Sequence, residues 1–316
     1  GSSFKRISKV SISPKSYNNK YGVPLSLFNV NQDDNYGVLE VGMDKKGEID
    51  YLSKIIQPDV SVITNINYAH AKNFKNIKQI AMAKAEIIGN TKSGGFVILN
   101  ADDKFFELHK KIAHQYNLKT ISFGIKSMKS DVKLIGIKKE GKIFRVNIKV
   151  RNLKKHFIIS NNFENNIYNI LASLAVMSIY IEISQFKKDL FLNFQVPVGR
   201  GDLSQIRIKN KNIYLIDESY NSNPLSLKSA ILNYDKINVK NANKYLLLGD
   251  MLELGNHSKK LHQSIIPIIN KTSINKVFVK GDKVKMIFDK LLKSKKGRIL
   301  SNKEEIIDLI KNHLNN

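Results

Sequence analysis

Short apolar runs alternate with segments of helical spacing over the first hundred residues of the chain. Val38–Val41, Val60–Ile63 and Phe96–Leu99 have the length and composition of buried strands. Between them, apolar residues recur every three to four positions in Ile49–Ile56 and Ile77–Ile88, as in amphipathic helices. Strands that alternate with helices favour βαβ units and a mainly parallel sheet, so we expect an α/β domain here.

The apolar period changes to two between Ser130 and Ile159. This alternation predicts antiparallel strands joined by a hairpin, and so a small sheet that is inserted in the first domain or lies at its edge. Gly136–Ile143, inside this stretch, nearly matches a phosphate-binding loop. We reject that interpretation because Ile143 lacks the hydroxyl that Mg²⁺ needs, and because such a loop must open a helix.

The alternation of helix and strand returns after the hairpin. Further elements are expected at Ile167–Ile181 (helix) and at Ile213–Ile216, Tyr245–Leu248 and Lys276–Val279 (strands). Asn223-Pro224 is typical of a helix start, since Asn caps a helix and Pro is tolerated in its first turn. At 316 residues the chain is long enough for two domains, which we expect at 1–197 and 198–316.

Charge and composition narrow the class of protein. The net charge is +25, but the basic residues do not form one stripe and no aromatic residues are interleaved with them. We therefore expect weak affinity for polyanions at low salt and no specific nucleic-acid partner. The chain has no cysteine, no apolar stretch long enough to span a membrane and no apolar signal segment, which favours a cytoplasmic protein.

Three side chains in the first domain are candidates for metal chemistry. Glu40 follows a buried strand at a glycine-bordered turn, where a carboxylate can bind Mg²⁺, or can instead cap a helix or form a salt bridge. His70 lies in the loop after Val60–Ile63, where open sheets bind ligands, although it can also be a plain surface histidine. Lys84 has the small neighbours Ala83 and Ala85, which allow close approach, although a helical lysine is usually only solvated.

Polar residues also cluster at two later helix starts. Asn166 and Asn169 carry amides that can read both a donor and an acceptor on a base edge, or can cap a helix. The strand Ile213–Ile216 ends in two acids, and the stretch from Asp217 to Pro224 then leads into a helix. These positions are candidates for nucleotide contacts.

The motifs, in this order along the chain, resemble those of the Mur ligases. The resemblance is carried by the runs around Glu40, from Thr64 to His70, from Ala83 to Ile87 and from Asp217 to Pro224, and by the glycine-bordered run Gly249–Gly255. It implies a central ATPase domain with a mainly parallel sheet and a small antiparallel sheet, and a Rossmann-like α/β C-terminal domain.

The resemblance also implies an activity. It points to an ATP-dependent amide-bond ligase of peptidoglycan precursor synthesis, a monomer that adds D-Ala-D-Ala to UDP-N-acetylmuramoyl-tripeptide through an acyl phosphate. The implied cofactors are ATP and Mg²⁺. Two alternatives stay open: a ligase of the same superfamily with another substrate, such as another Mur ligase or folylpolyglutamate synthase, and a non-catalytic remnant or basic binding protein.

Residue roles follow by matching motif to motif. The resemblance implies that Glu40, His70 and Lys84 surround Mg²⁺ as metal-binding and catalytic residues, with Lys84 carbamylated. It implies a further catalytic residue in Arg200, within Gly199-Arg200-Gly201, whose guanidinium reaches phosphate oxygens. The implied nucleotide contacts are Asn166, Asn169, Asp217, Tyr220, Asn221 and Asn223.

Some positions depart from the family pattern. No intact phosphate loop precedes Lys15, Asn165 stands where the family has histidine, and Ala71-Lys72 stands where it commonly has Leu-Glu. The chain also stops soon after Leu314. From these departures we expect a chain truncated at its N-terminus and C-terminus, and a phosphoryl transfer that is impaired without the loop.

Overall fold

The computed structural model describes residues 1–14, 16–161, 163–192, 199–208, 211–237 and 242–314, and these form two compact units. The described part of the first unit comprises Gly1–Ile66 and residues 73–192. The described part of the second unit comprises Asn67–Lys72 and the residues from 199 onward. The expected domain boundary between residues 197 and 198 lies outside the described residues.

The first unit is built on a six-stranded sheet with the order β3-β4-β5-β6-β7-β8. β3 (Val60–Ile63), β4 (Phe96–Asn100) and β5 (Lys119–Gly124) are parallel, and β6 (Val132–Glu140) continues them in parallel. β7 (Ile143–Val150) and β8 (Leu153–Ile159) follow in antiparallel order. The α/β fold with a mainly parallel sheet and antiparallel strands is confirmed, and the antiparallel strands extend the edge of the parallel sheet.

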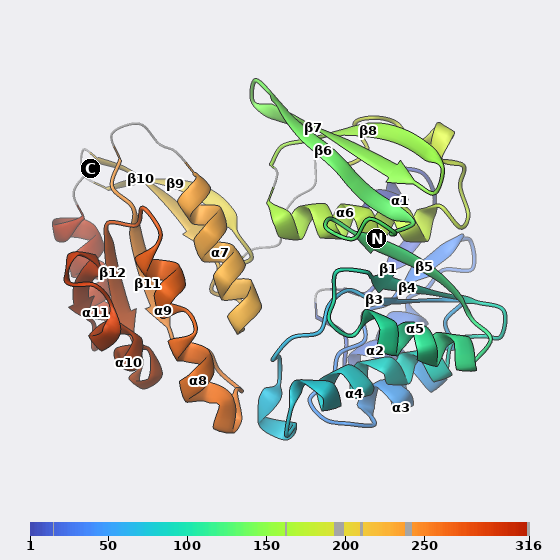
Figure 1. The fold of residues 1–316 in the computed structure, drawn as a ribbon, viewed down its shortest axis with the longest axis horizontal. Coiled ribbons are helices and arrows are strands. Elements are labelled where there is room, and N and C mark those ends of the chain that lie inside the picture. Colours follow the sequence, from blue (N-terminus) through green and yellow to red (C-terminus); the bar gives the residue numbers. More distant parts are fainter. Residues whose placement is uncertain (15, 162, 193–198, 209–210, 238–241, 315–316) are drawn as a thin grey trace. The chain divides into compact units, whose positions relative to one another are not determined.

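Helices cover both faces of this sheet (Figure 1). α4 (Ile77–Gly89) and α5 (Phe106–Gln115) pack on one face of β3–β5, with α3 (Glu48–Ile56) beside α4. α6 (Glu164–Met177) covers the other face and also the inner side of β6 and β7. The core beneath α6 contains several fully buried side chains, among them Phe123, Ile148, Phe157, Leu171 and Leu174.

Two predicted elements end earlier than expected. The strand expected at Val38–Val41 is β2 (Tyr36–Val38), which pairs in parallel with β1 (Val10–Ile12), so Glu40 lies in the loop beyond it. The helix expected to reach Ile181 ends at Met177, because the amides of Ile179 and Tyr180 bond three residues back and tighten the last turn. The first unit also contains α1 (Ser2–Lys5) and α2 (Gly22–Phe28).

The rejected phosphate-loop match is a hairpin, as predicted. Residues 136–143 run from β6 into β7, and Gly141 at the turn has the positive φ of 64° that this tight connection requires. No helix begins there in the described chain.

The second unit contains a parallel three-stranded sheet, β11 (Tyr245–Gly249), β12 (Lys276–Lys280) and β13 (Lys296–Ile299). A separate antiparallel pair, β9 (Asp202–Ile208) and β10 (Lys211–Asp217), precedes it. The helices of this unit are α7 (Pro224–Lys236), α8 (Ser258–Gln263), α9 (Ile266–Asn270), α10 (Asp282–Lys290) and α11 (Lys303–Asp308).

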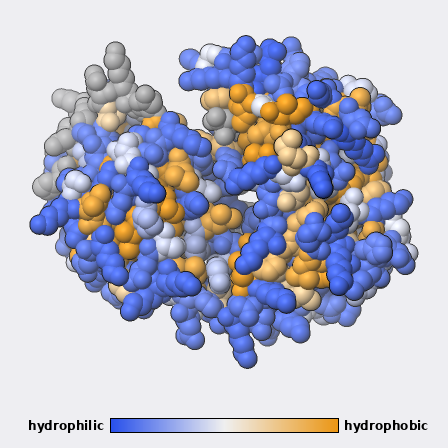
Figure 2. Space-filling view, viewed as in Figure 1, coloured by the Kyte–Doolittle hydropathy of each residue, from blue (hydrophilic) through white to orange (hydrophobic). Residues whose placement is uncertain are grey.

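The surface is strongly polar. Figure 2 shows hydrophilic residues over most of the visible face, in keeping with the net charge of +25. Among the described residues, no helix combines the length and the apolar character that crossing a membrane requires.

Candidate functional site

Lys84 lies on α4, whose start is fixed by a cap. The side chain of Asn76 accepts a hydrogen bond from the Gln79 amide, which satisfies one of the first free amides of the helix. About two turns along α4 from this cap, Lys84 is half-buried, and its Nζ donates to the carbonyl oxygen of Asn65 at 3.1 Å. Burial lowers the pKa of Lys84, and the nearby Asp103 carboxylate opposes that shift. The amine is therefore uncharged at a lower pH than a lysine in water.

The carbonyl that Lys84 contacts is held by residues at the end of β4. Asp103 accepts a hydrogen bond from the Ile66 amide at 2.7 Å, and the side chain of Asn100 donates to the Thr64 carbonyl at 3.0 Å. The loop after β3 is thus tied to the loop after β4, at the carboxyl ends of neighbouring parallel strands, where open α/β sheets bind ligands.

Asp102, beside Asp103, is a structural anchor. Its carboxylate accepts the amides of Ile125, Lys126 and Ser127 and the hydroxyl of Tyr168. Burial raises the pKa of Asp102, but these hydrogen bonds stabilise the ionised form and leave the pKa below its usual value. Asp102 fixes the chain between β5 and β6 and is not available for chemistry in this arrangement.

Glu40 is exposed and is held by neighbours from earlier in the chain. Its amide donates to the Ser13 hydroxyl at 3.0 Å, and Asn18 Nδ2 donates to its carboxylate at 2.8 Å. Asn18 lies so close to Gly42 that an added Cβ there would come within 2.9 Å of its side chain, which explains the glycine. Neither a helix cap nor an ion pair of Glu40 occurs among the described contacts.

Glu86, two residues after Lys84, joins α4 to α3. Its carboxylate accepts the Gly47 amide at 3.0 and 3.1 Å and the Asp50 amide at 3.1 Å. Gly47 is the N-cap of α3 and offers no side chain for that role, so Glu86 supplies the cap from the neighbouring helix. This residue stands within the Ala83–Ile87 motif but was not singled out from the sequence.

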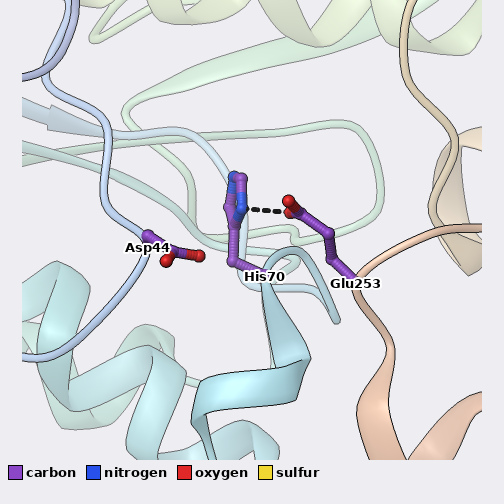
Figure 3. A group of neighbouring side chains, drawn as sticks. All are labelled: Asp44, His70 and Glu253. Carbon is purple, nitrogen blue, oxygen red and sulfur yellow. Dashed lines mark ion pairs between the residues drawn. The ribbon is translucent and has the colours of Figure 1, made fainter.

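His70, in the second unit, is paired with Glu253 (Figure 3). The Nδ1 atom of His70 lies 2.5 Å from a carboxylate oxygen of Glu253, and the Lys72 amide donates to the Glu253 carbonyl at 2.8 Å. Both His70 and Glu253 have positive φ angles, 54° and 60°, which are strained for residues other than glycine. His70 is therefore more than a plain surface histidine. Asp44, also drawn in Figure 3, belongs to the first unit.

Two motifs of the second unit meet at Tyr220. The Arg200 guanidinium lies 4.7 Å from the centre of the Tyr220 ring, a cation–π contact, and an added Cβ at Gly199 would come within 2.9 Å of Tyr220. Gly201 donates its amide to the Asp217 carbonyl at 2.7 Å. Hydrogen bonds from Ser219 lower the pKa of Asp217.

Asn223 caps α7, as its position before Pro224 predicts. Its side chain accepts the amides of Leu225 and Ser226, and the Ser226 hydroxyl accepts the Asn223 amide in return. Asn67 also donates its side-chain amide to Asn223. The structural role of Asn223 is confirmed, and the predicted nucleotide contacts of Tyr220, Asn221 and Asn223 stay predictions.

Asn166 and Asn169 line one shallow depression together with Ser3 and Phe191. The N-cap of α6 is Phe163, so the alternative in which these asparagines cap the helix is wrong. Asn166 instead donates to the side chain of Asn161 at 2.6 Å. Their contact with adenine stays a prediction.

The predicted metal-binding residues are divided between the two units. Glu40 and Lys84 lie in the first unit and His70 lies in the second. Their meeting around one ion therefore stays a prediction. Glu86 and Glu253 are partners that sequence reasoning did not single out, although both lie inside the motifs that carried the resemblance.

Comparisons with known proteins place these motifs in a family. A family model described as the Mur ligase middle domain matches residues 2–177. The UDP-N-acetylmuramoyl-tripeptide–D-alanyl-D-alanine ligase of Buchnera aphidicola (subspecies Acyrthosiphon pisum) is 34% identical over 313 residues, which cover 93% of this chain and 63% of that protein. The ligase of the same name from Rickettsia prowazekii is 33% identical over 297 residues, which cover 92% of this chain and 64% of that protein.

The fold of the chain also matches a solved structure of a ligase of this kind. A crystal structure of MurF from Acinetobacter baumannii matches with a TM-score of 0.86 at 25% identity, covering 99% of this chain and 67% of that one. The chain spans 63 to 64% of the length of the two curated relatives. Because the middle-domain model matches more than half of its residues, the chain belongs to the Mur ligase family.

Proposed function

We propose that this chain forms part of an ATP-dependent ligase that joins D-Ala-D-Ala to UDP-N-acetylmuramoyl-tripeptide. The observation that carries the proposal is the name shared by its relatives, since the proteins 34% and 33% identical to it are both ligases of that dipeptide. The amino-acid sequences of the motifs at Asp217–Pro224 and Gly249–Gly255 also favour this ligase over the other ligases of the family.

The proposed reaction has two steps. The terminal carboxylate of the tripeptide attacks the γ-phosphorus of ATP, ADP leaves and an acyl phosphate forms. The amine of D-Ala-D-Ala then attacks the acyl carbon, inorganic phosphate leaves, and the amine gives up a proton as the amide bond forms. Both steps develop negative charge on phosphate oxygens, so fixed positive groups accelerate them.

The side chains of Glu40, His70 and Lys84 suit a divalent cation. A carboxylate and an imidazole are ordinary ligands, and the lowered pKa of Lys84 favours the uncharged amine, which can react with CO₂ to give a carbamate and a proton. The carbamate replaces a positive charge by oxygen ligands. Bound Mg²⁺ would neutralise charge on the phosphates. We propose these three residues as its holders on the strength of the motif match.

The nucleotide contacts are proposed from the second unit and from α6. Arg200 is stacked on Tyr220, which limits the directions its guanidinium can take and suits a planar group that binds phosphate oxygens. Asp217, Tyr220, Asn221 and Asn223 are proposed to face the ribose and phosphates. Asn166 and Asn169 are proposed to contact adenine.

The test is phosphate release from ATP by the natural gene product that contains this chain. Release should require both the UDP-linked tripeptide and the dipeptide, and the product should gain the mass of D-Ala-D-Ala. Lys84→Ala and His70→Ala should each abolish release, whereas Lys78→Ala, an exposed change on the same helix, should leave it unchanged.

Other outcomes separate the alternatives. Release that depends on a different amino acid or on a folate would assign another ligase of the superfamily. A folded protein that binds ATP analogues or polyanions but releases no phosphate would support a non-catalytic remnant. Since ATP and the UDP-linked precursor are cytoplasmic metabolites, we also propose that the protein acts there, as a monomer.

A further inference from the structure

The three antiparallel strands β6, β7 and β8 have two very different faces. The inner face carries Val146, Ile148, Val150 and Phe157, all buried, and packs against α6 (Figure 1). The outer face points away from α6 and carries mostly charged or polar side chains. The residues of this outer face that we call the basic face are Lys133, Ile135, Lys138, Arg145, Asn147, Lys149, Lys154 and His156. The register also places Glu140, Ile143 and Ile158 on this side of the sheet.

Positive charge is concentrated in these strands. Residues 132–159 contain nine of the 52 lysines and arginines of the chain, but only one of its 27 acids, Glu140. This stretch of 28 residues therefore contributes +8 to the net charge of +25. The sequence alone does not show the concentration as a patch, because the basic residues alternate with apolar ones and come from three strands.

The register of the strands places like charges opposite one another. Lys149 of β7 is paired directly with Lys133 of β6 on one side and with Lys154 of β8 on the other. Lys138 is paired with Arg145 in the same way. Directly opposed like charges destabilise a sheet, so a row of three lysines across three strands is unfavourable without counter-charge.

The described residues supply little counter-charge on this face. Glu140 forms an ion pair with Arg145 at 3.0 Å. In the same part of the chain, no acidic partner is present for Lys138, Lys149 or Lys154, which are all exposed. A hollow lined by Ile135, Asn147, Lys154, Lys155 and His156 lies between the strands, so the half-exposed aliphatic side chain of Ile135 is set among the charges.

We propose that the basic face is a docking surface for an anionic lipid bilayer. Lysine is a point charge that suits a diffuse layer of lipid phosphates, whereas bidentate recognition of single phosphates favours arginine, and the arginine of this face is already paired with Glu140. Among the described residues of β6, β7 and β8, no Phe, Tyr or Trp lies on this face for bases to stack on, which argues against single-stranded nucleic acid. Ile135 can enter the interface between lipid headgroups.

Binding of the natural gene product to lipid vesicles tests this docking surface, which is independent of the proposed activity. Vesicles of phosphatidylcholine with about one third phosphatidylglycerol should bind the protein at low salt, and pure phosphatidylcholine should not. Each lysine near such a surface contributes roughly a fivefold factor in partitioning, so combining Lys133→Gln, Lys149→Gln and Lys154→Gln should reduce it roughly a hundredfold. Binding should also weaken sharply as salt shortens the screening length.

The matched control removes three charges elsewhere in the first unit. Lys78→Gln, Lys110→Gln and Lys111→Gln change exposed residues of α4 and α5, and this variant should keep most of the binding. Equal losses in both triple variants would show that net charge alone acts, and would overturn the proposal. So would a loss of duplex DNA or RNA binding in the first variant with vesicle binding intact. Circular dichroism melting of both variants establishes that they are folded.

Discussion

Lys84 combines a half-buried side chain with a hydrogen bond to a carbonyl, and this environment determines its chemistry. A carbonyl oxygen accepts a hydrogen bond from either form of the amine, while burial penalises the charged form. A lowered pKa means that the uncharged fraction is larger at any pH below the usual lysine range. Reaction with CO₂ requires that uncharged form, so the residue is prepared for modification before any metal binds.

We therefore predict a carbamate on Lys84 that increases with pH. Protein equilibrated with ¹³C-bicarbonate should show a carbamate carbon signal in the NMR spectrum, and the signal should grow as pH rises toward the lowered pKa of Lys84. Lys84→Arg should remove the signal, and Lys78→Arg should not. A signal that survives Lys84→Arg would mean that another amine is modified.

Glu253 is the partner that determines how the His70 ring is presented. A carboxylate on Nδ1 favours the tautomer whose lone pair is on Nε2, as with histidines that bind metals. Glu253→Ala is predicted to change the ¹⁵N shifts of the His70 ring in metal-free protein and to weaken Mn²⁺ binding about 10- to 100-fold. Glu304→Ala, an exposed acid of α11, is the control. Unchanged ring shifts in Glu253→Ala would contradict this role.

At the scale of elements, side-chain hydrogen bonds join α3 to α4. Glu86 caps the start of α3, and the Asn90 side chain, at the end of α4, donates to Asp50 at 3.0 Å and to Ser53 at 2.9 Å in the first two turns of α3. The loop after Glu40 leads directly into this capped start. Glu86 therefore keeps that loop in register with the helix that carries Lys84.

Glu86→Ala is predicted to lower the free energy of unfolding by about 1–2 kcal/mol, the usual effect of losing a helix cap. Amide exchange at Gly47 and Asp50 should become faster, and Glu86→Gln, which keeps one acceptor oxygen, should lose less. Asn90→Ala should destabilise the same helix pair without faster exchange at Gly47. Urea denaturation and hydrogen-exchange mass spectrometry measure these effects.

The elements that the sequence predicted well are those with a strong apolar period. β3 was expected at the residues where it occurs, and α3 and α4 were expected to within one residue at each end. β9 and β13 were missed because Asp202–Ile208 and Lys296–Ile299 contain too few apolar residues to show a period of two. Their strands are specified by pairing with a neighbour, which is a tertiary effect that local pattern does not show.

At the scale of the whole molecule, motif order identified the family, whereas local pattern could not identify partners that lie far apart in the sequence. His70 and Glu253, or Arg200 and Tyr220, meet only because the fold brings their loops together. The basic face likewise depends on strand register and not on any one segment. Long-range pairings of this kind are the part of the site that a single sequence leaves undetermined.

Two units with separate cores should unfold separately. Leu171 of α6 and Ile287 of α10 are both fully buried, one in each unit, and truncating such a side chain to alanine costs about 2–5 kcal/mol. We predict two transitions in differential scanning calorimetry, with Leu171→Ala lowering the temperature of one and Ile287→Ala lowering that of the other. The larger core beneath α6 assigns the transition of greater enthalpy to the first unit. If each substitution shifted both transitions by the same amount, the two units would unfold as one cooperative structure. The predicted metal-binding residues would then belong to a single unfolding unit and not to two.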